Sequence, residues 1–205
     1  MAGIGTYIDM VNPYKFRETI ERETTAENPH GVFINAIILA FISVLMSFVA
    51  AYMQNARIGM YSLPNMASYS SSLGSPLGVI ITFCIALFTV YLIPFAFNWI
   101  AKVLGGNGSF WRIAWPYTCI ALLFNIVSIP IYAIILTNWS VAVCAALFIP
   151  LLILYVYSYY LYYTVIRAAH RSLSRNKAIA TIIGAIILAG GIVEIVTFVR
   201  ILLRI

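Results

Sequence analysis

Five long apolar runs dominate the sequence and limit what the chain can fold into. Each is about 22–24 residues long, and a helix needs about 20 mostly apolar residues to cross the hydrocarbon of a bilayer. The runs are Val32–Met53, Leu77–Ile100, Ile113–Leu136, Val141–Tyr163 and Ala178–Val199. Because lipid offers no hydrogen-bond partners, the backbone of such a segment must bond within itself, which selects helices. The sequence therefore predicts an all-α bundle of five transmembrane helices.

Charged residues are too rare for a chain that faces water over most of its surface. They make up 9% of the sequence, against roughly 25% in soluble domains. The lipid bilayer is therefore the expected partner of most side chains. The net charge of +6 suits loops at an anionic leaflet. We expect no nucleic-acid binding, because no segment between the apolar runs is long enough to form a basic domain.

Residues 1–31 form a predicted N-terminal cytoplasmic segment ahead of a membrane domain at residues 32–205. Asn12-Pro13 is typical of a helix start, since Asn can cap a helix and Pro suits its first turn. Arg17 and Glu21 have the i,i+4 spacing of a helical ion pair. We predict a short amphipathic helix from Pro13 to about Glu23. It lies either on the membrane surface or, as an ordinary solvated helix, on the loops.

The distribution of Lys and Arg predicts the orientation, because cytoplasmic loops carry an excess of both. With the N-terminus inside, nine of them lie on the inner side: Lys15, Arg17, Arg22, Lys102, Arg112, Arg167, Arg171, Arg175 and Lys177. Three lie on the outer side: Arg57, Arg200 and Arg204. This favours an N-in/C-out layout. In the alternative, the last segment is re-entrant and turns at Gly190-Gly191.

Glu194 is the most informative polar residue within the apolar runs. A carboxylate there is costly, and it often marks an ion or proton site or a contact to another helix. It also lies six residues before Arg200, where the outer interface could solvate it. In a transporter or channel, Glu194 would be the ion or proton site, and the helices that contain proline would act as gates.

A glycine-rich turn is a second candidate site. It contains Gly105, Gly106 and Gly108 between the second and third apolar runs. A phosphate-binding loop would need a preceding strand and a following Lys-Ser/Thr, and both are missing. We interpret the segment as a flexible inner turn.

The last inner loop is strongly basic and is a third candidate site. Its cations are Arg167, Arg171, Arg175 and Lys177. Such a loop would attract anionic lipid by about 1 kcal/mol per charge. The orientation rule by itself also accounts for these charges.

Small residues on the last apolar run could bring another helix close. Ala180, Gly184 and Gly191 share one helical face, and small residues at such spacing let two helix backbones approach. The face serves either internal packing or the binding of another membrane protein.

Signatures of an enzyme are missing from the sequence. It contains neither a GxSxG nucleophile elbow nor an HExxH zinc motif. His30 and His170 lie in separate segments outside the apolar runs, and the three cysteines have no CxxC-type spacing. We therefore expect no catalytic residue, no cofactor and no metal site, and we leave open which small molecule, if any, is a substrate.

The order of these features resembles the Yip1 domain family of membrane proteins. Asn12-Pro13 precedes the first helix, the sequence LGGNGSF follows the second at Leu104–Phe110, and Trp115-Pro116-Tyr117 opens the third. His170–Ala178, with the sequence HRSLSRNKA, leads into the last helix. The resemblance covers about the whole chain, and it implies a five-helix, N-in layout.

The resemblance also implies a function. Eukaryotic members resemble trafficking factors of the endoplasmic reticulum and Golgi that associate with Rab GTPases, and they carry a longer polar N-terminal region. The short segment here suggests a prokaryotic member in the cytoplasmic membrane; a eukaryotic one would lie in the endoplasmic reticulum or Golgi membrane. We expect a non-catalytic, multi-pass protein of membrane trafficking or membrane organisation. The alternatives are a transporter or channel, and an accessory subunit of a larger membrane complex.

Overall fold

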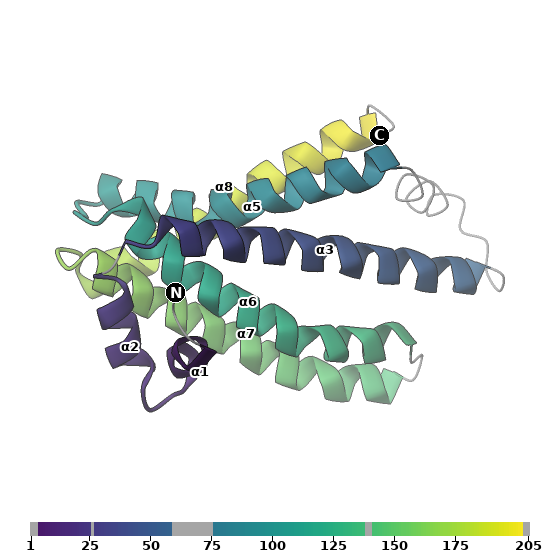
Figure 1. Cartoon of the computed structure of the whole chain (residues 1–205), viewed down its shortest axis with the longest axis horizontal. Coiled ribbons are helices and arrows are strands. Elements are labelled where there is room, and N and C mark those ends of the chain that lie inside the picture. Colours follow the sequence, from purple (N-terminus) through teal and green to yellow (C-terminus); the bar gives the residue numbers. More distant parts are fainter. Residues whose placement is uncertain (1–3, 26, 59–75, 138–140, 203–205) are drawn as a thin grey trace.

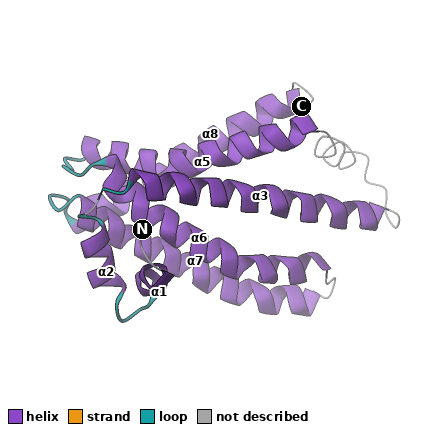
Figure 2. Ribbon diagram, in the orientation of Figure 1, coloured by secondary structure: helices purple, strands orange, loops and turns teal. Residues whose placement is uncertain are grey.

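The described part of the chain is helical throughout. The computed structural model describes residues 4–25, 27–58, 76–137 and 141–202, and within these ranges it contains no strand (Figures 1 and 2). Two short helices come first, α1 (Ile4–Val11) and α2 (Phe16–Glu23). Five long helices follow: α3 (Pro29–Ile58), α5 (Pro76–Val103), α6 (Phe110–Thr137), α7 (Val141–Ala169) and α8 (Arg175–Leu202).

Four of the long helices are long and apolar enough to cross a membrane. The parts of these helices that qualify as candidate spans are Pro29–Val49, Pro76–Val103, Phe110–Tyr132 and Ala145–Ala169. These four candidate spans coincide with the first four predicted spans, with ends that differ by a few residues; that they cross the membrane at these bounds stays a prediction. The helices are longer than the apolar runs because polar residues such as Arg167 continue the same backbone hydrogen bonding past the hydrocarbon.

The helix α8 contains the fifth predicted span. Its 28 residues correspond to about 42 Å at a rise of 1.5 Å per residue. The helix continues through Gly190-Gly191 without a break, which argues against the re-entrant alternative. That α8 crosses the membrane, and that the C-terminus lies outside, stay predictions.

The helix α3 lies between two helix pairs. It packs against α5 on one side and α6 on the other, while α5 also packs against α8 and α6 against α7. The five long helices converge at the end that carries α1 and α2 and spread apart toward the opposite end (Figure 1). The buried core therefore gathers at the converging end.

The N-terminal segment differs from the single predicted helix. Two helices form, and Asn12 and Pro13 lie in the link between them. The Asn12 side-chain oxygen accepts a hydrogen bond from the backbone N–H of Tyr14 at 2.9 Å. Asn12 therefore makes a local turn, as Asn often does, and the second helix begins only at Phe16.

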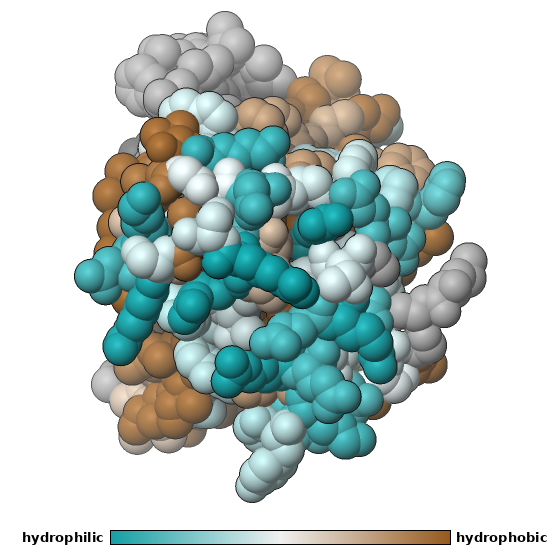
Figure 3. Space-filling model, turned by 90° about the vertical axis from the view of Figure 1, so that its left-hand side faces the viewer, coloured by the Kyte–Doolittle hydropathy of each residue, from teal (hydrophilic) through white to brown (hydrophobic). Residues whose placement is uncertain are grey.

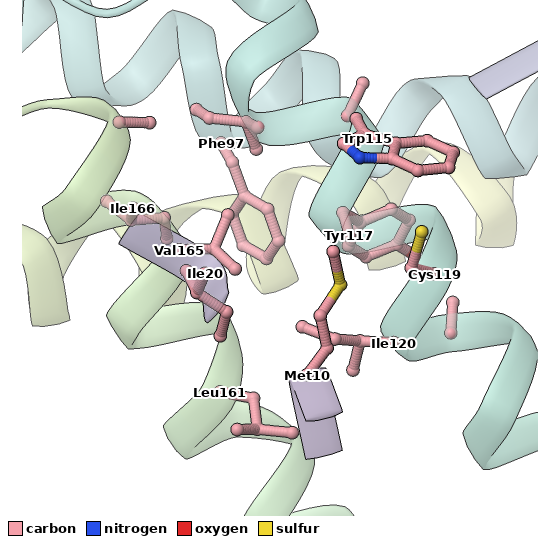
Figure 4. Packing of buried hydrophobic residues seen from close by; sticks show 14 of the residues in the cluster. Met10, Ile20, Phe97, Trp115, Tyr117, Cys119, Ile120, Leu161, Val165 and Ile166 are labelled. Atoms are coloured by element: carbon pink, nitrogen blue, oxygen red, sulfur yellow. The ribbon is translucent and has the colours of Figure 1, made fainter. Parts of the chain in front are cut away.

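Both short helices insert side chains into the core (Figure 4). Met10 of α1 and Ile20 of α2 are fully buried, among residues of α6 and α7 such as Ile120, Leu161 and Ile166. Burial of one such side chain contributes about 1.5–3 kcal/mol. The N-terminal segment is thus part of the packed bundle. The sequence analysis had expected a helix on the membrane surface or a solvated helix on the loops, and neither description includes this packing.

Replacing Ile20 by Ala should lower the free energy of unfolding by about 2–4 kcal/mol, because it removes buried methyl groups and leaves a cavity. Ile8→Ala is the matched control, since Ile8 is 54% exposed on α1. Thermal unfolding of the two variants in detergent measures the difference. Equal losses of stability would show that α2 is not part of the core.

Candidate functional site at the polar end of the bundle

The charged residues gather at the converging end of the bundle. Every charged side chain that the structure describes lies on α1 or α2, on the ends of the long helices that meet there, or in the links between these helices. Figure 3 looks onto this end and shows a mainly hydrophilic surface. We call it the polar cap: α1, α2, the links at residues 104–109 and 170–174, and the helix turns that adjoin them.

The glycine-rich turn packs tightly against the link between α7 and α8. A Cβ at Gly106 would overlap the His170 imidazole, and one at Gly108 would lie 2.5 Å from the carbonyl oxygen of Ala169. Gly105 has a φ of 94°, in the left-handed region that favours glycine. The glycines of this turn therefore make a close approach to the α7–α8 link possible, while the flexibility expected from the sequence stays a prediction.

His170 is the residue on which the turn rests. It is fully buried, and its Nδ1 accepts a hydrogen bond from the backbone N–H of Gly108 at 2.8 Å. The neutral imidazole therefore carries its proton on Nε2, which has no partner among the described residues. Burial, together with the positive charge of Lys102, lowers the pKa of His170 from 6.5 to about 4.

Sequence reasoning missed the role of His170. The histidine and Gly108 are 62 positions apart in the chain, so no local pattern connects them. Both fall within the segments that carry the family resemblance, and that was the one signal linking them.

The basic loop divides into residues with different tasks. The Lys177 ammonium donates to the carbonyl oxygen of Leu104 at 2.9 Å, near the end of α5, where free carbonyls and the helix dipole favour a cation. The Ser172 hydroxyl donates to the carbonyl oxygen of Gly105 at 3.0 Å. Lys177 is therefore a structural link between α5 and α8, whereas Arg175 is exposed and makes no ion pair with the described residues.

Two glutamates connect the N-terminal segment to α6. The Trp115 indole N–H donates to the Glu23 carboxylate at 3.1 Å, and the Ser109 hydroxyl donates to Glu27 at 2.7 Å. Arg112 lies 3.7 Å from the same Glu27 carboxylate. These contacts hold the end of α2 and the start of α3 on the first turns of α6.

A buried amide completes the attachment of α1. The Tyr7 hydroxyl donates to the Asn35 side-chain oxygen at 3.0 Å, and the Asn35 amide donates to Thr118 Oγ1 and Cys119 Sγ at 3.4 Å each. Asn35 is 1% exposed, and these partners offset the cost of burying it. One side chain thus joins α1, α3 and α6.

The remaining candidates do not form one common site. Arg167 and Arg171 line a hollow beside α2. Gly184 faces Ile100 of α5, so this part of the small-residue face serves internal packing, while Ala180 is exposed and Gly191 has nothing within 4 Å. The backbone of Glu194 belongs to α8, but its side chain lies outside the described residues. No group of His, Cys, Asp or Glu within the described ranges could hold a metal ion.

The fold defines a multi-pass α-helical membrane protein whose N-terminal helices close one end of the bundle. The sequence matches the family model of the Yip1 domain over residues 8–196, a stretch that runs from α1 into α8 and includes the polar cap. The chain therefore belongs to the Yip1 family, a non-catalytic membrane family, which confirms the resemblance. No curated protein and no solved structure matches it.

The buried neutral His170 should make stability depend on pH. Its folded-state pKa of about 4 lies below its ordinary value of 6.5, so the unfolded chain binds the extra proton between these values. Stability should be complete above about pH 6.5 and fall by up to about 3 kcal/mol as the pH drops toward 4.

Unfolding midpoints in detergent across this pH range test the prediction. His170→Asn should flatten the profile, because Asn offers an acceptor that does not titrate. His30→Gln is the control at an exposed histidine and should keep the full pH dependence. A His170→Asn profile as steep as that of the wild type would contradict this role.

Proposed function

We propose that this protein organises membranes or binds partner proteins through its polar cap, in the manner of a trafficking-type member of the Yip1 family. The observation that carries the proposal is the burial of Met10 and Ile20. Because both short helices are anchored in the core, the cap presents a surface of defined shape. A surface that is ordered before binding loses less conformational entropy when it binds.

Charge supports the same proposal. On α2, the side of Ile20 faces the core, while Arg17, Glu18 and Glu21 are exposed. Arg175 extends the charged surface at the start of α8. Charges of both signs on an exposed surface favour selective, electrostatically guided binding of a partner. The excess of Lys and Arg supports placing this end on the cytoplasmic side.

Purification in mild detergent, with identification of the proteins that co-purify, tests this function. The double variant Glu18→Lys with Arg175→Glu should reduce the captured partners at least about tenfold, because it inverts two exposed charges of the cap. Phe88→Ala, at an exposed apolar position of α5, is the control and should keep them. Partners that remain with the double variant but disappear with the control would contradict binding through the cap.

The transporter and accessory-subunit hypotheses stay predictions, and the same preparations separate them from the proposal. Reconstituted protein that moves a solute, with flux lost in Glu194→Gln, would favour transport over the proposed function. A stoichiometric complex with other membrane subunits would favour an accessory role.

A further inference from the structure

A hollow of about 530 Å³ opens between α2 and the end of α7. Three arginines border it: Arg17 on α2, Arg167 on α7, and Arg171 just beyond the end of α7. The acidic residue of the lining is Glu21. From this arrangement we propose that the hollow binds the phosphate of an anionic phospholipid headgroup, drawn from the leaflet in which this end of the bundle sits.

The positive charge of the hollow is not neutralised by the protein. Glu21 lies 3.3 Å from Arg17 and pairs with it. Neither Arg167 nor Arg171 forms an ion pair within the described residues. The guanidinium of Arg167 has one side-chain hydrogen bond, to the neutral Tyr163 hydroxyl at 3.4 Å. Two arginines with free donors thus border one hollow, and the planar guanidinium matches the oxygens of phosphate.

The position of the hollow favours a lipid as the source of the phosphate. Arg167 lies two residues before Ala169, the end of the fourth candidate span. Tyr160 and Tyr163 line the hollow, and tyrosine is enriched at the level of the headgroups. The charged groups therefore lie where lipid phosphates are concentrated.

The face of α7 below the hollow suits an acyl chain. Ile149, Ile153 and Val156 are exposed by 60% or more, and Tyr160 by 52%. These positions follow each other by four, three and four residues and lead into Thr164 and Arg167 by the same spacing, so they share one helical face. Along one side of α7, exposed apolar side chains are thus followed by cations at the end of the helix. A phospholipid has the matching order of acyl chains and then an anionic headgroup.

The helix α2 distinguishes this hollow from an ordinary basic loop. The ring of Phe16 packs edge-on against that of Tyr160, with 5.5 Å between centroids, and Ile20 anchors the same helix in the core. Arg17 directly follows Phe16 in the chain. It is therefore held at the hollow across from Arg167 and Arg171. The excess of Lys and Arg expected on the cytoplasmic side explains the basic residues on α7. It does not explain why the N-terminal helix α2 lines the other side of the hollow.

The test uses the full chain, reconstituted in nanodiscs of phosphatidylcholine and phosphatidylglycerol and then transferred to neutral detergent. Native mass spectrometry counts the lipids that stay bound. The wild type should retain phosphatidylglycerol in preference to phosphatidylcholine. Arg167→Gln with Arg171→Gln should reduce this preference at least about tenfold, because two charge-assisted contacts to phosphate are lost.

A charge-matched variant separates the hollow from the general positive charge of the cap. Arg22→Gln with Arg175→Gln removes the same charge outside the hollow and should keep the preference within about twofold. Equal losses in the two double variants would overturn the proposal. If the Arg167→Gln with Arg171→Gln variant unfolds, Arg167→Lys with Arg171→Lys takes its place. This variant keeps the charge and should still weaken retention, because Lys lacks the bidentate geometry. Unchanged retention would then refute the proposal.

Inorganic phosphate distinguishes a lipid site from a site for a free anion. Phosphatidylglycerol should stay bound when phosphate is added at millimolar concentration, because the acyl chains add contacts along α7. Displacement of the lipid by phosphate alone would contradict the lipid assignment. The outcome is independent of the proposed function, since lipid retention is measured without any protein partner.

Discussion

A bilayer offers the backbone no hydrogen-bond partners, and this constraint organises the whole chain. It selects long helices for the apolar runs and makes charged residues costly away from the helix ends. In this protein the described charges collect at one end. The helices converge there (Figure 1), so the charged residues lie next to the best-packed part of the core.

The polar cap is held by satisfied polar contacts laid over this core. Trp115 bonds Glu23, Asn35 bonds Tyr7, and Lys177 bonds the end of α5. Each contact joins segments that are far apart in the chain, and most buried polar atoms of the cap thereby find a partner. One exception among the described residues is His170 Nε2, which belongs to the imidazole that the glycine turn approaches closely.

Local patterns predicted the features that depend on composition within a single segment. The first four spans could be recognised because hydropathy over about 20 residues is sufficient evidence for a membrane helix. The family could be recognised because its short motifs occur in the right order. The second short helix was expected from its ion-pair spacing, but its start was displaced because Asn12 turns the chain instead of capping a helix.

By itself, the sequence determined that the chain enters a membrane, which runs form the first four candidate spans, and to which family it belongs. The tertiary structure decided the rest: that α1 and α2 complete the core, that glycine is needed to fit His170, and that Arg17 meets Arg167 and Arg171 at one hollow. The physical reason is distance along the chain. Periodicity and hydropathy describe neighbours within a segment, whereas these contacts exist only once the long helices have brought their ends together.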